Sequence, residues 1–112
     1  MKKNLIVLVL CFLLSGCNSS YAKLDIETLM KENEYIIIDV RTKEEYEQSH
    51  IVDAINIPYD LIDENINLDK DNIIFVYCKS GGRSQIAYNN LTNLGYEVYD
   101  LGAFSEINLP KE

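Results

Sequence analysis

Residues 73–84 read IIFVYCKSGGRS, an apolar run that leads directly into a cysteine, two glycines and an arginine. Residues 73–77 predict a buried strand, and the pattern of residues 84–94 predicts a helix after the loop. Glycines let successive backbone N–H groups turn toward one point, and the start of a helix adds partial positive charge there. This stretch therefore predicts a strand, a loop that can surround an anion, and a helix.

Cys78 begins this loop, and Lys79 and Arg83 add two positive charges. A thiol close to N–H groups and cations loses its proton more easily than a free cysteine, and the thiolate is the nucleophilic form. The alternative is an inert cysteine buried at a strand end, which is common. The glycines and cations favour a nucleophilic Cys78. The residues expected to bind its anionic substrate are Lys79, Ser80, Gly81, Gly82 and Arg83.

The N-terminal residues differ from the rest of the chain. Lys2 and Lys3 precede an apolar run over residues 5–14, and the tetrapeptide LSGC follows at residues 14–17. This order is typical of a secretory signal, and the run is shorter than the roughly 20 residues of a membrane-spanning helix. The tetrapeptide resembles the bacterial lipobox, which implies cleavage before Cys17 and lipidation of that residue. An uncleaved anchor, or an ordinary signal peptide with a chance cysteine, is the alternative.

The chain has 112 residues, enough for one small domain. We expect a lipoprotein signal peptide at residues 1–16, a lipidated tether at residues 17–23 and one domain at residues 24–112. The net charge of −8 disfavours binding to nucleic acid or to anionic lipid surfaces. A lipid on Cys17, rather than charge, would therefore hold the protein at a membrane. The expected location is extracytoplasmic, on a bacterial membrane.

The cysteines predict no disulfide within the chain. Cys11 leaves with the signal peptide and Cys17 carries lipid, so Cys78 remains alone. A lone thiol in an oxidising compartment is either buried and inert or kept for its reactivity. With one histidine and one free cysteine, the sequence predicts no metal site and no cofactor.

Strand-like and helix-like segments alternate after residue 25, which predicts an α/β domain with a mainly parallel sheet. The capping-box pair Thr42 and Glu45 marks the start of one helix. Residues 59–68 predict about one helical turn followed by a loop. The predicted strands are residues 35–38, 54–57, 73–77 and 96–101, and the predicted helices are residues 26–32, 43–48 and 84–94.

Asp39 and Arg41 end the first predicted strand. Ligands of parallel sheets bind beyond the carboxyl ends of the strands, so both residues are candidates for the edge of the pocket around Cys78. The alternatives are that Asp39 caps or pairs with the backbone, and that Arg41 pairs with a carboxylate such as Glu44 or Glu45. The acidic span of residues 44–71 is interpreted as a solvated surface, with partner docking as the alternative.

Four motifs, in this order, resemble the rhodanese-like domain family. They are DVR at residues 39–41, EY with HI and AINIP between residues 45 and 58, CKSGGRS at residues 78–84, and LGY with LGA between residues 94 and 103. The resemblance implies one domain with a mainly parallel five-stranded sheet and helices on both faces. It places His50 at a turn before a strand, so we expect a structural role for His50 rather than that of a base for Cys78.

The resemblance also implies sulfur transfer. Cys78 would take a sulfane sulfur from a small anionic donor such as thiosulfate, hold it as a persulfide and pass it to a thiol or other thiophilic acceptor. A persulfide anion needs N–H donors and positive charge, which this loop supplies. The alternatives are a partner-binding or persulfide-carrier module without turnover, and a phosphatase or arsenate reductase. The active-site loops of those two enzymes look like C-x5-R, with five residues between cysteine and arginine, whereas four residues separate Cys78 from Arg83.

Overall fold

The computed structural model describes residues 26–112, so the predicted signal peptide, the tether and Cys17 lie outside the described residues. The chain divides into two compact units, Met1–Glu32 and Asn33–Glu112. In the first unit, residues 26–32 form a helix, as the sequence predicted. No helix between residues 26 and 112 is long and apolar enough to cross a membrane.

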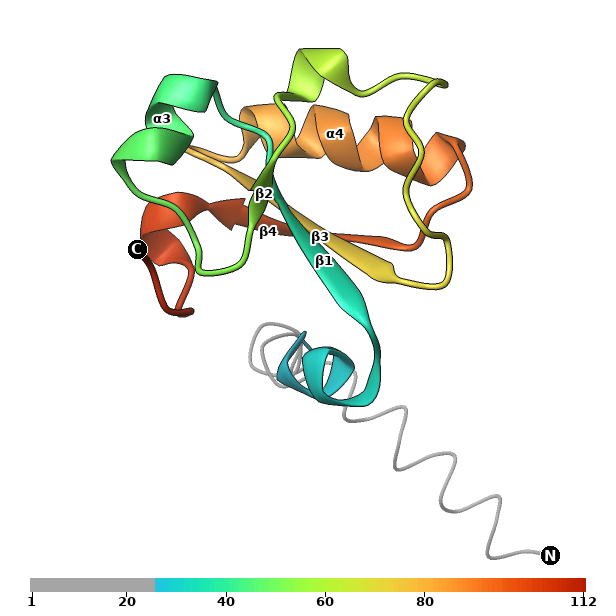
Figure 1. Cartoon of the computed structure of the whole chain (residues 1–112), viewed down its shortest axis with the longest axis horizontal. Coiled ribbons are helices and arrows are strands. Elements are labelled where there is room, and N and C mark those ends of the chain that lie inside the picture. Colours follow the sequence, from blue (N-terminus) through green and yellow to red (C-terminus); the bar gives the residue numbers. More distant parts are fainter. Residues whose placement is uncertain (1–25) are drawn as a thin grey trace, which may run out of the picture. The chain divides into compact units, whose positions relative to one another are not determined.

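The second unit is built on a sheet of parallel strands (Figure 1). Their order is β2-β1-β3-β4, so β1 and β3 lie in the middle. The predicted α/β class and parallel sheet are confirmed; the described part of the chain contributes four strands where the resemblance implied five. The strands are β1 (Tyr35–Asp39), β2 (Ile55–Asn56), β3 (Ile73–Cys78) and β4 (Val98–Ala103).

The strand ends differ from the predicted ones mainly at β4. The sequence predicted a strand over residues 96–101 and a turn at Gly102 and Ala103, but both residues belong to β4. Val76 pairs with Asp100 and Tyr77 pairs with Gly102, so the register shifts by one residue at this point. Gly102 has φ 83°, a conformation that favours glycine, and its N–H donates to the side chain of Asp100. A bulge therefore bends β4 where a turn was expected.

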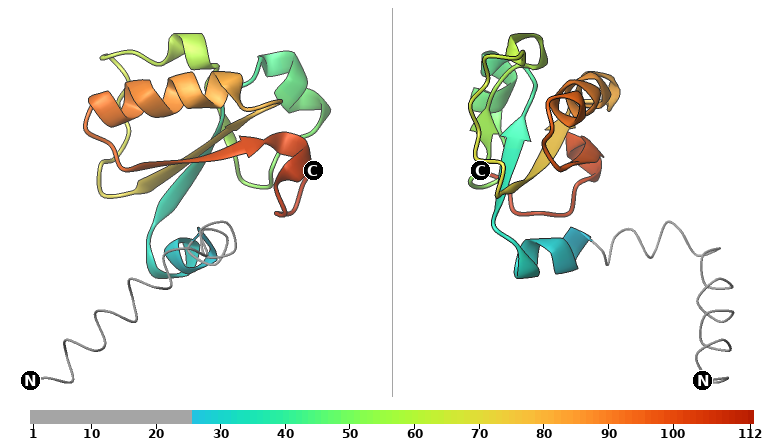
Figure 2. Two further views of the ribbon diagram at one scale, coloured as in Figure 1. Left: turned by 180° about the vertical axis from the view of Figure 1, so that it is seen from behind. Right: turned by 90° about the vertical axis from the view of Figure 1, so that its right-hand side faces the viewer.

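α4 (Gly82–Asn93) covers one face of β3 and β4 (Figure 2). Alternate residues of β3, including Val76 and Cys78, point into the core under Ala87 and Leu91 of α4. Every residue of β3 is buried, as predicted for a strand covered on both faces. On the other face, the ring of Tyr77 stacks on Phe104 of the 3-10 helix η2 (Phe104–Glu106).

Local signals explain the remaining elements. α3 (Lys43–Gln48) has the predicted capping box between Thr42 and Glu45, and the 3-10 helix η1 (Tyr59–Leu61) is the single turn expected there. α4 begins two residues before its predicted start because Gly81, at φ 105°, serves as its N-cap. Gly95, at φ 97°, follows the end of α4 as predicted. Because β3 runs parallel to its neighbours, the loop that joins β3 to α4 lies at the carboxyl edge of the sheet.

Candidate active site

The cysteine loop is held at both ends by regular structure. Cys78 is the last residue of β3 and pairs with Ala103 of β4, while α4 begins at Gly82. Only residues 79–81 lie between these elements. Gly81 adopts φ 105° without steric cost, and its backbone N–H donates to the Cys78 Sγ atom over 2.9 Å. The tight turn thus places an N–H donor directly on the sulfur.

The pKa of the Cys78 thiol is lowered by its hydrogen-bond donors. Burial alone would raise this pKa, because a buried thiolate loses its hydration. The side chain of Ser84 and the backbone groups of Ser84, Gly81 and Ser80 stabilise the thiolate and outweigh burial. Lys79 and Arg83 were also expected to lower this pKa. In the structure, the groups that lower it most, the Ser84 side chain and backbone groups of the loop, carry no net charge.

Ser84 is a site residue that sequence reasoning missed. It is fully buried, and its Oγ atom lies 3.5 Å from the Cys78 Sγ atom and 3.1 Å from the carbonyl oxygen of Gly81. The thiol can therefore donate to the hydroxyl, and the hydroxyl to the carbonyl. A hydroxyl residue in the first turn of a helix that begins beside a thiol is the sequence signal that could have identified it.

The two cations of the loop have different surroundings. The Arg83 Nη1 and Nη2 atoms donate to the two carboxylate oxygens of Glu45 over 2.8 and 3.1 Å. This bonding to Arg83 lowers the pKa of Glu45 to about 2. Lys79 is exposed and forms no ion pair within residues 26–112. Lys79 is thus available to an anionic ligand, whereas Arg83 is engaged with α3.

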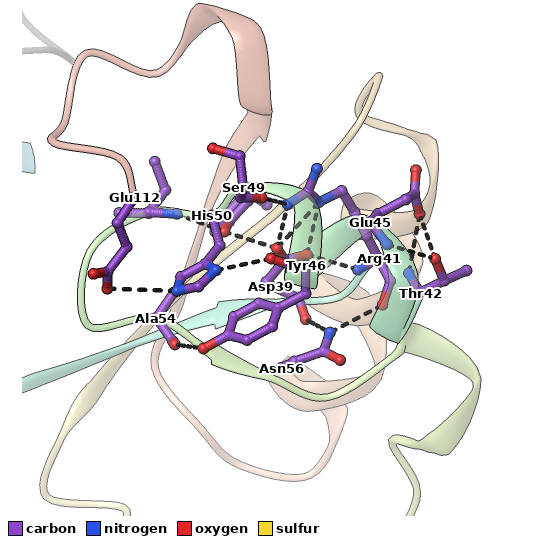
Figure 3. A network of polar contacts seen from close by, with 12 residues as sticks. Asp39, Arg41, Thr42, Glu45, Tyr46, Ser49, His50, Ala54, Asn56 and Glu112 are labelled. Atoms are coloured by element: carbon purple, nitrogen blue, oxygen red, sulfur yellow. Dashed lines mark hydrogen bonds and ion pairs between the residues drawn. The ribbon is translucent and has the colours of Figure 1, made fainter.

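Asp39 and Arg41 form a buried ion pair at the end of β1 (Figure 3). The guanidinium donates to both carboxylate oxygens, and the shortest distance joins Nη2 to Oδ2 at 2.6 Å. The Tyr77 hydroxyl donates to the same carboxylate over 2.8 Å and accepts the N–H of Ile51. This network ties β1, β3 and the turn at residue 51 together.

Arg41 pairs with a nearby carboxylate, as predicted, but its partner is Asp39 rather than Glu44 or Glu45. The chain turns after β1, so that the backbone N–H of Arg41 also reaches the Asp39 carboxylate, at 2.9 Å. Glu45 is occupied by Arg83. The Asp39 and Arg41 side chains are 0% and 7% exposed, so they lie beneath the surface rather than along an open pocket edge.

His50 lies among structural contacts (Figure 3). Its ring stacks on Tyr46 at 3.8 Å between centroids, and its Nδ1 atom lies 2.8 Å from the Tyr46 carbonyl oxygen. Its Nε2 atom lies 3.5 Å from a carboxylate oxygen of Glu112. These partners lie in α3 and at the C-terminal end of the chain, which supports the structural role expected for this residue.

The Cys78 sulfur can act as a nucleophile, because the loop stabilises its thiolate form. Cys78 has a lowered pKa, and N–H donors surround the atom where the charge resides. Lys79, which is exposed and follows Cys78 directly, adds a full positive charge to the loop. Within residues 26–112, no three or more His, Cys, Asp or Glu side chains gather to hold a metal ion.

Comparison with known proteins gives a consistent result. Residues 23–108 match the family model of the rhodanese-like domain. Thiosulfate sulfurtransferase PspE of Escherichia coli is 40% identical over 78 residues, which are 66% of this chain and 75% of that protein. A solved structure described as rhodanese with anions from E. coli has a TM-score of 0.65 and 38% identity, covering 70% of this chain and 96% of that chain.

Some relatives are much longer than this chain. A probable molybdopterin-synthase adenylyltransferase of Porphyra purpurea is 40% identical over 91 residues, which are 72% of this chain and 24% of that protein. An adenylyltransferase and sulfurtransferase of Ogataea parapolymorpha is 35% identical over 77 residues, 67% of this chain and 20% of that protein. The chain thus spans about a quarter or less of these curated relatives.

Proposed function

The chain belongs to the rhodanese-like domain family, and on that premise we propose that it is a thiosulfate sulfurtransferase. The observation that carries the proposal is the sulfur of Cys78, which has a lowered pKa and accepts the N–H of Gly81 over 2.9 Å. Two relatives named as thiosulfate sulfurtransferases, of Escherichia coli and Coxiella burnetii, are 40% and 35% identical to the chain.

The reaction proceeds in two steps through Cys78. Its thiolate attacks the sulfane sulfur of thiosulfate; the S–S bond of thiosulfate breaks, and sulfite leaves with the bonding electrons. Cys78 then carries a persulfide, whose negative charge lies on the terminal sulfur. A thiophilic acceptor such as cyanide attacks that sulfur, forms thiocyanate and restores the thiolate.

The loop residues stabilise the anions of both steps. The backbone N–H of Gly81 and the hydroxyl of Ser84 lie against the sulfur of Cys78, where thiolate charge must be held. Lys79 and Ser80 are exposed whereas Cys78 is buried, so we expect the donor to approach past these two residues. Lys79 attracts the donor's negative charge.

The same loop disfavours phosphate and arsenate as substrates. Four residues separate Cys78 from Arg83, one fewer than in the phosphatase and arsenate reductase pattern. Arg83 is also paired with Glu45, so its guanidinium is not free to bind a tetrahedral oxyanion. A misplacement of about 1 Å can cost on the order of 100-fold in rate, so geometry rather than charge selects the substrate.

Mass spectrometry of the intact protein tests the proposal. After exposure to thiosulfate, the protein gains the mass of one sulfur atom, and cyanide removes it; Cys78→Ser gains nothing. The same preparation is assayed for thiosulfate-to-cyanide transfer, aryl phosphate hydrolysis and arsenate reduction. Phosphatase or reductase activity that exceeds sulfur transfer and disappears in Cys78→Ser would refute the proposal. Persulfide formation without turnover would instead indicate a carrier module.

We also propose that the mature protein begins at a lipidated Cys17 and lies outside the cytoplasm on a bacterial membrane. The support is the order of the N-terminal sequence: two lysines, the apolar residues 5–14 and the tetrapeptide LSGC. Residues 1–16 are then the signal peptide and residues 17–23 a short tether to the rhodanese-like domain. Two or more acyl chains on Cys17 give stable anchoring, whereas one chain binds only marginally.

A further inference from the structure

The ion pair between Glu45 and Arg83 joins α3 to the start of α4, directly after the cysteine loop. Both guanidinium distances, 2.8 and 3.1 Å, are hydrogen-bond distances, and each nitrogen has its own carboxylate oxygen. This two-pronged geometry fixes the orientation of the guanidinium as well as its position. The side chains of Arg83 and Glu45 are 29% and 27% exposed, so solvent screens the pair only partly.

The Glu45 carboxylate is also held by hydrogen bonds within its own helix cap. Its Oε1 atom accepts the backbone N–H of Thr42 over 3.0 Å and the Thr42 hydroxyl over 3.1 Å, as part of the capping box of α3 (Figure 3). The carboxylate is therefore anchored to α3, and the long Arg83 side chain reaches toward it. Arg83 follows the anion loop in the sequence, but its charge is compensated by a helix outside the loop.

Electrostatic attraction at the loop is reduced by this arrangement. Arg83 lies in the first turn of α4, directly after the loop that begins at Cys78; its pKa is raised by bonding to Glu45 and, to a smaller extent, by the charge of Cys78. With Glu45 bound to Arg83, the pair has no net charge, and Lys79 remains as the uncompensated cation of the loop among the described residues. The attraction of an anionic donor scales with the donor's charge, so each added cation favours a dianion more than a monoanion.

We propose that Glu45 is a specificity-determining residue: by neutralising Arg83, it limits the preference of the site for doubly charged over singly charged sulfur donors. The inference rests on the proposed sulfurtransferase function and adds that the site selects donors by their charge. With Glu45 in place, the site accepts monoanionic donors such as organic thiosulfonates beside the thiosulfate dianion. Without its charge, the site favours thiosulfate.

Steady-state kinetics of Glu45→Gln with two donors test this. Glutamine also fits the last position of a capping box, so α3 keeps its start. Because the Coulomb energy doubles from monoanion to dianion, we expect kcat/KM to rise about fourfold for thiosulfate and about twofold for benzenethiosulfonate. The ratio of the two values then rises about twofold.

Two further variants separate the pair from a general charge effect. Glu44→Gln removes the same charge from an exposed neighbour on α3 that forms no ion pair with Arg83, and its donor ratio stays at the parent value. Arg83→Gln makes the opposite change, because it leaves the charge of Glu45 uncompensated, and the donor ratio then falls about twofold. An equal rise in Glu44→Gln, or an unchanged ratio in Arg83→Gln, overturns the inference.

A measurement without sulfur transfer distinguishes failure of this inference from failure of the proposed function. Cys78 is alkylated with iodoacetate, an anion, and with neutral iodoacetamide. In Glu45→Gln, the iodoacetate rate relative to the iodoacetamide rate rises about twofold. If the parent protein forms no persulfide from either donor, the proposed function fails, while the alkylation ratio still decides the role of Glu45. An unchanged ratio overturns that role.

Discussion

The hydroxyl of Ser84 lies against both the sulfur of Cys78 and the carbonyl oxygen of Gly81. It can donate to the carbonyl while Cys78 is protonated, and to the sulfur once the thiolate has formed. Such a change of partner stabilises the thiolate without adding a further charge. The reactivity of Cys78 therefore depends on a buried neutral neighbour as well as on the backbone of the loop.

We predict that Ser84→Ala raises the pKa of Cys78, because burial persists while a donor to the thiolate is lost. The rate of iodoacetamide alkylation increases with pH as the thiolate forms, so the midpoint of this increase moves to higher pH. At neutral pH the rate falls about fivefold, the equivalent of one hydrogen bond of ordinary strength. Ser105→Ala, which removes an exposed hydroxyl, serves as the control. An unmoved midpoint in Ser84→Ala would contradict the prediction.

Arg41 is predicted to matter for stability. Arg41→Ala leaves the carboxylate of Asp39 buried with the Tyr77 hydroxyl and the backbone N–H of residue 41 as its donors among the described residues, and removing one partner of a buried pair costs about 3–5 kcal/mol. Urea denaturation measures this loss in the free energy of unfolding. Arg41→Lys restores only part of it, because an ammonium cannot donate to both oxygens as a guanidinium does. A loss below about 1 kcal/mol in Arg41→Ala would place the pair among weak surface ion pairs.

At the scale of the elements, Glu45 of α3 pairs with Arg83 of α4, and the charge of Glu45 makes this contact dependent on pH. Pairing with Arg83 lowers its pKa from 4.5 to about 2 in the folded protein. The carboxylate form is thus favoured by folding, and the resulting stabilisation is complete above pH 4.5 and lost as the pH falls toward 2. The contact between α3 and the start of α4 weakens over this range.

We predict that the free energy of unfolding of Glu45→Gln falls less between pH 4.5 and pH 2 than that of the parent protein, because this variant has no carboxylate to protonate. Urea titrations followed by circular dichroism across the range measure the difference. Glu44→Gln should follow the parent curve, since Arg83 keeps its partner. Parallel curves for Glu45→Gln and the parent would show that the pair does not contribute to acid sensitivity.

The helices and strands were largely predictable because their signals are local. Residues 35–38 of β1 and the whole of β3 are unbroken apolar runs rich in β-branched residues, and α3 has its capping box. β4 was misplaced because the bulge at Gly102 depends on its pairing with Tyr77, which the sequence of β4 does not encode locally. Interaction with a neighbouring strand, rather than propensity, determined that boundary.

At the site, the position of the cysteine loop was predictable but several partners were not. Glu45 and Arg83 are 38 residues apart in the sequence, so their pairing depends on how α3 and α4 lie against each other. The partner of Arg41 was closer: an aspartate two residues earlier at a strand end can bond the following backbone, which is a recognisable turn signal. Charge complementarity alone pointed to the wrong carboxylates.

For the molecule as a whole, the N-terminal sequence predicts an anchor. We predict that Cys17→Ser abolishes labelling by a radioactive fatty acid and leaves the precursor unprocessed, because the lipobox pattern implies both lipidation of this cysteine and cleavage directly before it. Gel mobility and lipid labelling measure both effects in cells. Cys11→Ser, which lies within the apolar run, should be processed normally. Normal processing of Cys17→Ser would contradict the proposed anchor.

The parallel pairing of β1 with β3 also affects how long Cys78 stays exposed while the chain folds. Tyr35 pairs with Ile73 and Asp39 with Tyr77, so a long segment must close before the centre of the sheet exists. Chains dominated by such distant contacts fold slowly. Until β3 is in place, Cys78 is an open thiol exposed to irreversible oxidation, and afterwards it is fully buried. Slow folding therefore lengthens the time for which this thiol is open to oxidation in an oxidising medium.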